Sequence, residues 1–110
     1  MQQGEIWYTN LNPIKGSEQS GIRPVVIISG NLMNKYLNVV ITCPLITKIK
    51  NYKGNVVLKP NSTNKLKATS EILVFHIRSI SKGRFTKKIG DISPEELKLL
   101  KKGLDDVLRY

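Results

Sequence analysis

The sequence predicts an α+β fold that is mostly β, namely a small, strongly bent β-barrel followed by a C-terminal helix. Two patterns predict this fold. Over the first ninety residues, short β-branched segments recur roughly every ten to fifteen residues, with Gly, Pro and Asn between them. The end of the chain instead carries a helix start signal and apolar residues at helical spacing. With 110 residues and no repeat or linker, the chain is expected to form one domain over residues 1–110.

The predicted strands differ in how completely they should be covered. Glu5–Leu11 alternates, with Ile6 and Tyr8 on one face and Trp7 on the other, which is typical of a half-exposed strand. The remaining elements are buried strands over Arg23–Ser29 and Asn38–Ile46, further strands over Asn55–Lys59, Glu71–Ile80 and Phe85–Ile89, and a helical turn over Asn31–Tyr36. Pro44 lacks an N–H, so it indicates an edge position or a bulge near the end of its strand.

A capping box marks the start of the C-terminal helix. Ser93 is the predicted N-cap, Pro94 occupies the first helical position, and Glu96 completes the box. The apolar stripe that follows comprises Leu97, Leu100, Leu104 and either Val107 or Leu108. Gly103 lowers the stability of this helix by roughly 1 kcal/mol relative to alanine, so the helix should depend on docking against the barrel or a partner. Leu99 lies off the stripe and is available for a second contact.

Charge points to a polyanionic ligand. The chain has 18 Lys and Arg against 8 Asp and Glu, for a net charge of +10. Only three of the acids, Glu5, Glu18 and Glu71, lie in the first ninety residues, so the barrel is strongly basic and the last twenty residues are nearly neutral. Nucleic acid is the commonest ligand of such a body. The alternative is a solvated surface that only keeps the protein in solution.

Nothing in the sequence indicates export or a membrane span. The longest apolar runs, such as Val25–Ile28, are far too short to cross a bilayer. The first residues lack the basic and apolar regions of a secretory signal. Cys43 is the only cysteine, so an intrachain disulfide is impossible, and we expect a cytoplasmic protein with no membrane partner.

The residue types favour metal-free chemistry. With one histidine and one cysteine, the chain has no zinc site by Cys/His spacing, and its acids are too scattered for a two-metal nuclease. No Gly-rich phosphate loop is present, so neither a metal nor a cofactor is expected. RNA offers a metal-free route, because the ribose 2′-OH can attack the adjacent phosphorus. Such an enzyme needs proton transfer and donors to the phosphoryl oxygens.

Residues 16–26 are the most specific segment. They read Gly-Ser-Glu-Gln-Ser-Gly-Ile-Arg-Pro-Val-Val, a polar loop that runs into a buried strand. This segment resembles the signature of the MazF/PemK family, the toxin endoribonucleases of type II toxin–antitoxin systems. Further matching positions are Gly4–Trp7, Asn12, Pro13, Pro44, Thr47, Ser70, Ile77–Ile80, Arg84, Ile89 and Gly90. The resemblance implies an SH3-like barrel of the PemK and CcdB type, with a C-terminal helix.

The resemblance also implies a catalytic pair, at Arg23 and Thr47. Arg23 would stabilise the pentacoordinate phosphorane, and Thr47 would donate a hydrogen bond to a phosphoryl oxygen. Arginine is a poor base, so Glu18 is the candidate to take the 2′-OH proton or to orient Arg23. The alternatives are that Arg23 and Glu18 only pair within the loop, and that Thr42 takes the place of Thr47.

Other polar residues divide into RNA contacts and packing residues. We expect Ser17 and Gln19 of the loop to contact RNA. Three lysines near Thr47 either bind the phosphates of the RNA backbone or form an ordinary solvated run of charges. They are Lys48, Lys50 and Lys53. The residues expected to serve in packing or at a barrel edge are Trp7, Tyr8, His76, Arg78 and Arg84.

By resemblance, the protein is expected to act as a homodimer. Single-stranded RNA would lie in a basic groove between the subunits, and an acidic antitoxin would displace it with a tail that folds on binding. The expected activity is sequence-specific cleavage of mRNA to a 2′,3′-cyclic phosphate and a 5′-hydroxyl. Two rival hypotheses are a nucleic-acid-binding barrel that does not cut, and a toxin that poisons DNA gyrase.

Overall fold

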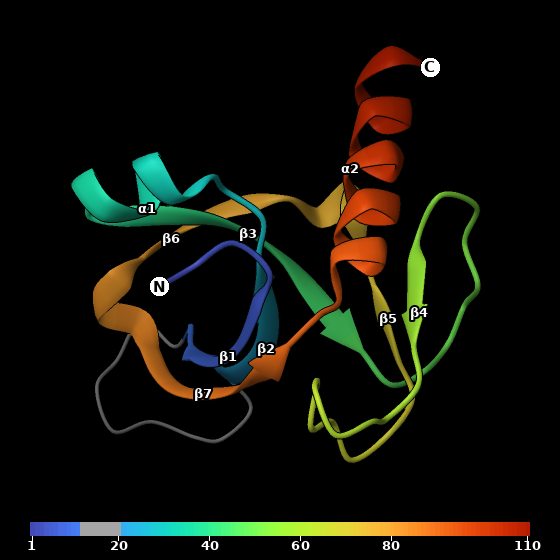
Figure 1. Ribbon diagram of the computed structural model, residues 1–110, viewed down its shortest axis with the longest axis horizontal. Coiled ribbons are helices and arrows are strands. Elements are labelled where there is room, and N and C mark those ends of the chain that lie inside the picture. Colours follow the sequence, from blue (N-terminus) through green and yellow to red (C-terminus); the bar gives the residue numbers. More distant parts are fainter. Residues whose placement is uncertain (12–20) are drawn as a thin grey trace.

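The computed structural model describes residues 1–11 and 21–110 (Figure 1). Three residues that the sequence places in the site, Ser17, Glu18 and Gln19, lie outside the described residues. The elements are β1 (Glu5–Asn10), β2 (Ile22–Ile27), α1 (Asn31–Tyr36), β3 (Val39–Ile46), β4 (Val56–Leu58), β5 (Ser70–Ile72), the 3-10 turn η2 (Val74–His76), β6 (Arg78–Ser81), the 3-10 turn η3 (Lys82–Arg84), β7 (Phe85–Asp91) and α2 (Pro94–Arg109). The predicted mostly-β fold with a C-terminal helix is confirmed.

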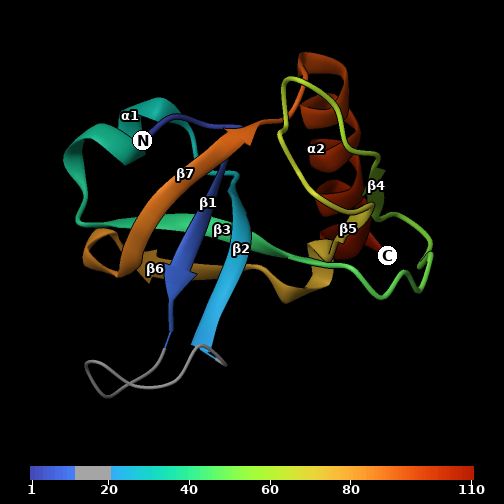
Figure 2. The ribbon, with the colours of Figure 1, turned by 90° about the horizontal axis from the view of Figure 1, so that it is seen from below.

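In the part of the chain that the structure describes, seven strands form one bent sheet in which neighbouring strands pair antiparallel. The strand order is β4-β5-β3-β2-β1-β7. The remaining strand, β6, pairs with the first part of β3, from Val39 to Thr42, and β5 pairs with the end of β3, at Leu45 and Ile46. Figures 1 and 2 show α2 beside the β4–β5 end, where it contacts β4 and η2. No described helix is long and apolar enough to cross a membrane.

The hydrophobic core contains residues from the sheet and from α2. Its buried apolar residues are Ile6, Val26, Cys43, Leu45, Val56, Leu58, Ile72, Val74, Ile92 and Leu100. Val25, Val26 and Ile27 are each at most 1% exposed, so the second half of β2 is covered on both faces, as predicted, whereas Ile22 and Arg23 at its start are exposed. Burial raises the pKa of the Cys43 thiol to about 12. This thiol therefore stays protonated near neutral pH and serves as a packing residue.

The simple alternation predicted for the first strand is wrong. Ile6 and Thr9 have no exposed surface although they are three residues apart, and Trp7 and Tyr8 between them are both half-buried. The pairing of β1 with β7 shifts register between Ile6 and Trp7 and again between Tyr8 and Thr9. Such bulges turn successive side chains to new faces, and they bend the strand into the barrel.

Pro44 marks a change of partner inside β3, not an edge. On one side β3 pairs with β2, and Pro44 lies opposite Val25. On the other side β6 pairs with β3 as far as Thr42, and β5 begins at Leu45. Pro44 therefore sits at the changeover, where its missing N–H leaves no ladder bond unmade. Its carbonyl accepts a hydrogen bond from the Leu73 N–H at 2.9 Å.

The prediction of one strand over Glu71–Ile80 is wrong. The segment forms β5 and β6, and η2 separates them. At this break the Val74 N–H donates to the Asn55 side-chain oxygen at 3.0 Å, so a side chain replaces a neighbouring strand as its partner. The chain can turn here without leaving a buried N–H unpaired. The turn presents Phe75 and His76 at the surface.

The helix start predicted for α2 is confirmed. The Glu96 N–H donates to the Ser93 hydroxyl at 3.1 Å, and the Ser93 N–H donates to the Glu96 carboxylate at 2.7 Å. Leu100 is fully buried, whereas Val107 and Leu108 are 44% and 82% exposed. The apolar stripe therefore docks over its first turns and leaves the last turn uncovered. Leu99 is 56% exposed, as its off-stripe position predicts.

Close docking explains the glycine inside α2. A Cβ added at Gly103 would lie 2.3 Å from the carbonyl oxygen of Gly54 and 3.5 Å from a Val74 methyl group. The helix can approach the loop before β4 only because this position has no side chain. The intrinsic cost of glycine in a helix is thus offset by tertiary contact, and alanine here would push α2 away from that loop.

Candidate functional site

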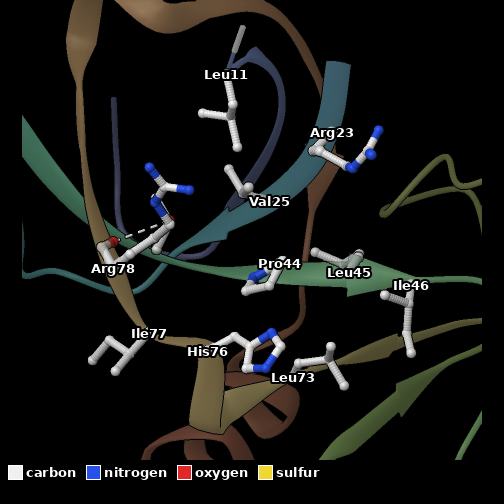
Figure 3. Close-up of a pocket in the computed structure, with 11 residues that line it drawn as sticks. Leu11, Arg23, Val25, Pro44, Leu45, Ile46, Leu73, His76, Ile77 and Arg78 are labelled. Atoms are coloured by element: carbon white, nitrogen blue, oxygen red, sulfur yellow. Dashed lines mark hydrogen bonds between the residues drawn. The ribbon is translucent and has the colours of Figure 1, made fainter. Parts of the chain in front are cut away.

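A pocket of about 530 Å³ opens where β2, β3 and η2 meet (Figure 3). Most of its lining is apolar and includes Leu11, Val25, Pro44, Leu45, Leu73 and Ile77. Arg23, His76 and Arg78 add groups that are positive or can become so. No acidic residue is among the described residues that line it. This mixture suits a ligand that combines flat apolar rings with negative charge.

Arg23 lies at the start of β2, where the strand leaves the loop. Its backbone pairs with Thr9 of β1, and the Thr9 hydroxyl donates to the Arg23 carbonyl at 3.0 Å, which fixes the main chain. The side chain is exposed at the pocket and donates to the Ile22 carbonyl at 3.0 Å (Figure 3). Among the residues that the structure describes, most donors of its guanidinium have no partner and are available to an anion. Because Glu18 lies outside the described residues, its pairing with Arg23 stays a prediction.

Thr47 follows β3 directly and is exposed. The pairing of β2 with β3 ends where Val25 lies opposite Pro44; Arg23 lies two residues before Val25, and Ile46 lies two residues after Pro44. Both of these residues line the pocket, and Thr47 comes next in the chain. The structure thus places the predicted pair at neighbouring strand ends. Thr47 itself does not line the pocket.

Thr42, the alternative to Thr47, has no exposed surface. Its hydroxyl donates to the Arg78 carbonyl at 3.2 Å, across the pairing of β3 with β6. A hydroxyl that is buried and already donating is poorly placed to serve a phosphate. Although Thr42 lines the pocket and Thr47 does not, Thr47 is the exposed residue of the two, and this exposure favours Thr47 as the hydroxyl donor.

Two residues that the sequence analysis placed in packing or edge roles line the pocket. His76, in η2, and Arg78, at the start of β6, are both exposed, and Figure 3 shows them on the side opposite Arg23. One signal was present in the sequence: an imidazole and a guanidinium stand two residues apart in an apolar run, which favours a common face. Arg84 instead donates to the Asn10 carbonyl at 3.5 Å, as an edge contact would.

The three candidate lysines lie in the loop between β3 and β4, and all are exposed. A buried carboxylate shapes this loop. Glu71 of β5 has no exposed surface, and its Oε1 accepts from the N–H groups of Lys50 at 2.7 Å and Asn51 at 2.9 Å. Its Oε2 accepts from the Tyr52 N–H at 2.9 Å and from the Asn55 amide at 3.0 Å. The loop is therefore fixed from beneath.

Burial alone would raise the pKa of the Glu71 carboxyl. The Asn55 amide and the three loop N–H groups outweigh this and hold the pKa below its usual range. Glu71 is therefore ionised near neutral pH, and its charge is satisfied by donors without a cation. No role for Glu71 is predicted from the sequence. Its only signal was a single acid within an apolar, lysine-rich stretch.

Trp7 and Tyr8 lie away from this pocket. The Trp7 ring packs edge to face on Phe85, with 6.0 Å between centroids, and its indole N–H donates to Glu5 at 2.8 Å. Tyr8 lines a smaller depression with Lys65 and Lys87 among others. The expected packing role of Trp7 fits these contacts. Within residues 1–11 and 21–110, no three His, Cys, Asp or Glu side chains gather in a group able to hold a metal ion.

The chain resembles known proteins over nearly its whole length. The model of the family described as the PemK-like, MazF-like toxin of type II toxin–antitoxin systems matches residues 2–108. Endoribonuclease MazF of Staphylococcus saprophyticus is 35% identical over 106 residues, which cover 96% of this chain and 88% of that protein.

Solved structures agree in fold. MazF of Deinococcus radiodurans superimposes with a TM-score of 0.79 at 24% identity, over 100% of this chain and 97% of that one. An endoribonuclease in complex with its cognate antitoxin, from a mycobacterial species, gives a TM-score of 0.80 at 18% identity over 98% and 94%. Together with the strand-end arginine and the capped helix, the family match settles where this protein belongs. The chain is a member of the PemK-like, MazF-like family of toxins of type II toxin–antitoxin systems.

Proposed function

We propose that this protein is a toxin endoribonuclease that cleaves single-stranded mRNA at specific sequences without a metal ion. One observation carries the proposal: Arg23 lines a pocket with His76 and Arg78, and the exposed Thr47 directly follows β3, the strand paired with β2. These residues combine phosphate-binding donors with a group able to move a proton. The net charge of +10 favours a polyanionic substrate, and the relative from Staphylococcus saprophyticus is named an endoribonuclease.

The proposed reaction is an internal transesterification. The ribose 2′-oxygen forms a bond to phosphorus while a base removes its proton, and the bond from phosphorus to the 5′-oxygen breaks. A proton passes to the leaving oxygen, so the products are a 2′,3′-cyclic phosphate and a 5′-hydroxyl. Arg23 and Thr47 donate hydrogen bonds to the non-bridging oxygens, where negative charge grows in the transition state.

Two groups can serve as the base. Glu18 is the candidate from the sequence, and His76 is the candidate from the pocket, because its imidazole lines the pocket and has nitrogens that can accept and donate a proton. Alanine substitutions separate them, since removal of the base lowers kcat far more than removal of a binding group. A kcat that survives the loss of either residue alone would exclude that residue as the sole base.

Cleavage is expected to persist in excess EDTA, since no step of the proposed reaction uses a metal. The measurement is incubation of the purified protein with end-labelled single-stranded RNA, followed by electrophoresis. A barrel that binds without cutting would leave the RNA intact. A gyrase poison would also leave RNA intact but would change DNA supercoiling when gyrase is present. A strict need for Mg²⁺ or Mn²⁺ would overturn the mechanism.

We also propose a homodimer that an acidic antitoxin inhibits. The solved mycobacterial neighbour is an endoribonuclease in complex with its antitoxin. Here the last turn of α2 leaves Val107, Leu108 and Tyr110 exposed, and the basic body would attract an acidic chain. Sedimentation should show a dimer at micromolar concentration, and an acidic antitoxin peptide should stop cleavage. A fully active monomer, or a peptide that binds without slowing cleavage, would contradict this proposal.

A further inference from the structure

Two aromatic rings stand half-exposed beside the pocket, and the proposed reaction does not use them. Tyr52, in the loop between β3 and β4, and Phe75, in η2, meet edge to face with 5.3 Å between centroids. Their exposed fractions are 49% and 44%. Phe75 also contacts the imidazole of His76, with 4.6 Å between centroids, and His76 lines the pocket. The ring pair is therefore continuous with the candidate active site.

One buried network holds the main chain beneath both rings. The Glu71 carboxylate accepts from the Tyr52 N–H at 2.9 Å and from the Asn55 amide at 3.0 Å. The Asn55 oxygen accepts from the N–H of Val74, the residue before Phe75, at 3.0 Å. The main chain that carries the two exposed rings is thus held from a common centre, and the rings also contact each other. A ligand that binds such a prearranged surface loses little conformational entropy in ordering it.

The charges around the rings favour RNA as the occupant over a second copy of this chain. Tyr52 lies between Lys50 and Lys53 in the sequence, and both lysines are exposed, as is Lys48. A second copy that covered the same surface would bring these lysines toward like charges. A single strand of RNA instead offers flat bases for the rings and phosphates for the lysines.

We propose that Tyr52 and Phe75 form a stacking site for an unpaired base of the RNA substrate, next to the nucleotide whose phosphate lies at the pocket. This inference rests on the proposed function, because it assumes that the substrate is single-stranded RNA. Stacking on an aromatic face tolerates different bases, so the site contributes affinity and register more than sequence choice. Glu71 and Asn55 are positioning residues for it.

The test replaces each ring by an apolar side chain of similar size. In Tyr52→Leu and in Phe75→Leu, KM for RNA cleavage should rise about fivefold or more, the scale of one lost base–aromatic contact. The kcat should change little, because neither ring touches the reacting phosphate. Tyr52→Phe should keep the wild-type KM, because it keeps the aromatic face.

Direct binding gives a second readout. The probe is a short RNA spanning the cleavage site mapped for the wild type, with 2′-deoxyribose at the cut position and 2-aminopurine at each neighbouring base in turn. Wild-type protein should quench one probe position, and Tyr52→Leu should abolish that quenching. The matched control is Tyr36→Leu on α1, since Tyr36 is 70% exposed and has the Lys35 ammonium 5.3 Å from its ring. This control should behave as wild type.

Three outcomes would overturn the inference. Wild-type KM and quenching in both leucine variants would show that the rings do not contact RNA. Conversion of a dimer to a monomer by either variant would show that the surface is a subunit contact instead. Failure of the wild-type protein to cut any RNA would overturn the proposed function, and the stacking site with it. The first of these outcomes, in which the wild type cleaves RNA and both leucine variants keep its KM and quenching, would overturn the stacking site alone.

Discussion

Arg23→Ala is expected to lower the rate of RNA cleavage by about 10²-fold or more, the scale for removal of one transition-state donor. The side chain is exposed at the pocket, and its one hydrogen bond to residues 1–11 and 21–110 is to the neighbouring Ile22 carbonyl, so the fold should survive the change. Thr47→Ala should act in the same direction with a smaller effect, because it removes a single neutral donor. Cleavage rates are measured at saturating RNA, with circular dichroism to confirm folding.

A matched control is available on α2. Arg109 is also exposed, but it pairs with Asp105 at 3.1 Å and does not line the pocket. Arg109→Ala should therefore cleave like the wild type. Arg23→Lys keeps the charge but loses the planar pair of donors, so it should remain well below wild-type activity. A folded Arg23→Ala protein with wild-type cleavage would remove Arg23 from the catalytic site.

Glu71→Gln is expected to lower the free energy of unfolding by about 2–4 kcal/mol, because buried donors would lose their acceptor. Each carboxylate oxygen accepts two hydrogen bonds, so an amide nitrogen at either position would face two donors. Urea unfolding at neutral pH measures the loss. Glu5→Gln is the control: Glu5 is 9% exposed, receives the Trp7 indole N–H and pairs with Lys88 at 3.4 Å, so its loss should cost less.

The difference between wild type and Glu71→Gln should depend on pH in a defined direction. The pKa of Glu71 is held below its ordinary value of 4.5 in the folded state, by the Asn55 amide and the loop N–H groups acting against burial. Its contribution to stability is therefore complete above pH 4.5 and is lost as pH falls through the folded pKa. The two proteins should converge in stability on acidification. An equal difference at pH 7 and in acid would contradict this role for the carboxylate.

The elements that the sequence predicts well are those whose signals are local. The capping box of α2 needs only residues 93–96, and the buried strand around Val25 needs only a β-branched run. The break after Ile72 is different. It depends on the Asn55 side chain and the Pro44 carbonyl, which reach Val74 and Leu73 only in the folded barrel. No periodicity in the segment itself indicates it.

The candidate site also combines residues that a sequence motif predicts with residues that only the folded chain brings together. Arg23 and Thr47 are predicted from a family signature, and the antiparallel pairing of β2 with β3 brings the start of β2 and the end of β3 to the same side of the sheet. The sequence predicts a packing or edge role for His76, because a lone histidine in an apolar run is usually a packing residue, and only the η2 turn brings it to the pocket. The role of Glu71 is not predicted, because most of its partners are backbone N–H groups about twenty residues away. Backbone groups have no sequence signature.

The chemical identity of the ends formed in EDTA tests the central claim most directly. The account predicts a 5′-hydroxyl on one fragment and a 2′,3′-cyclic phosphate on the other, because the 2′-oxygen is the nucleophile. It also predicts that a single 2′-deoxyribose at the cut position abolishes cleavage there while the protein still binds that RNA. Fragments with 5′-phosphate ends, or cleavage of the deoxy-substituted strand at the same position, would contradict the metal-free mechanism proposed for the Arg23 pocket.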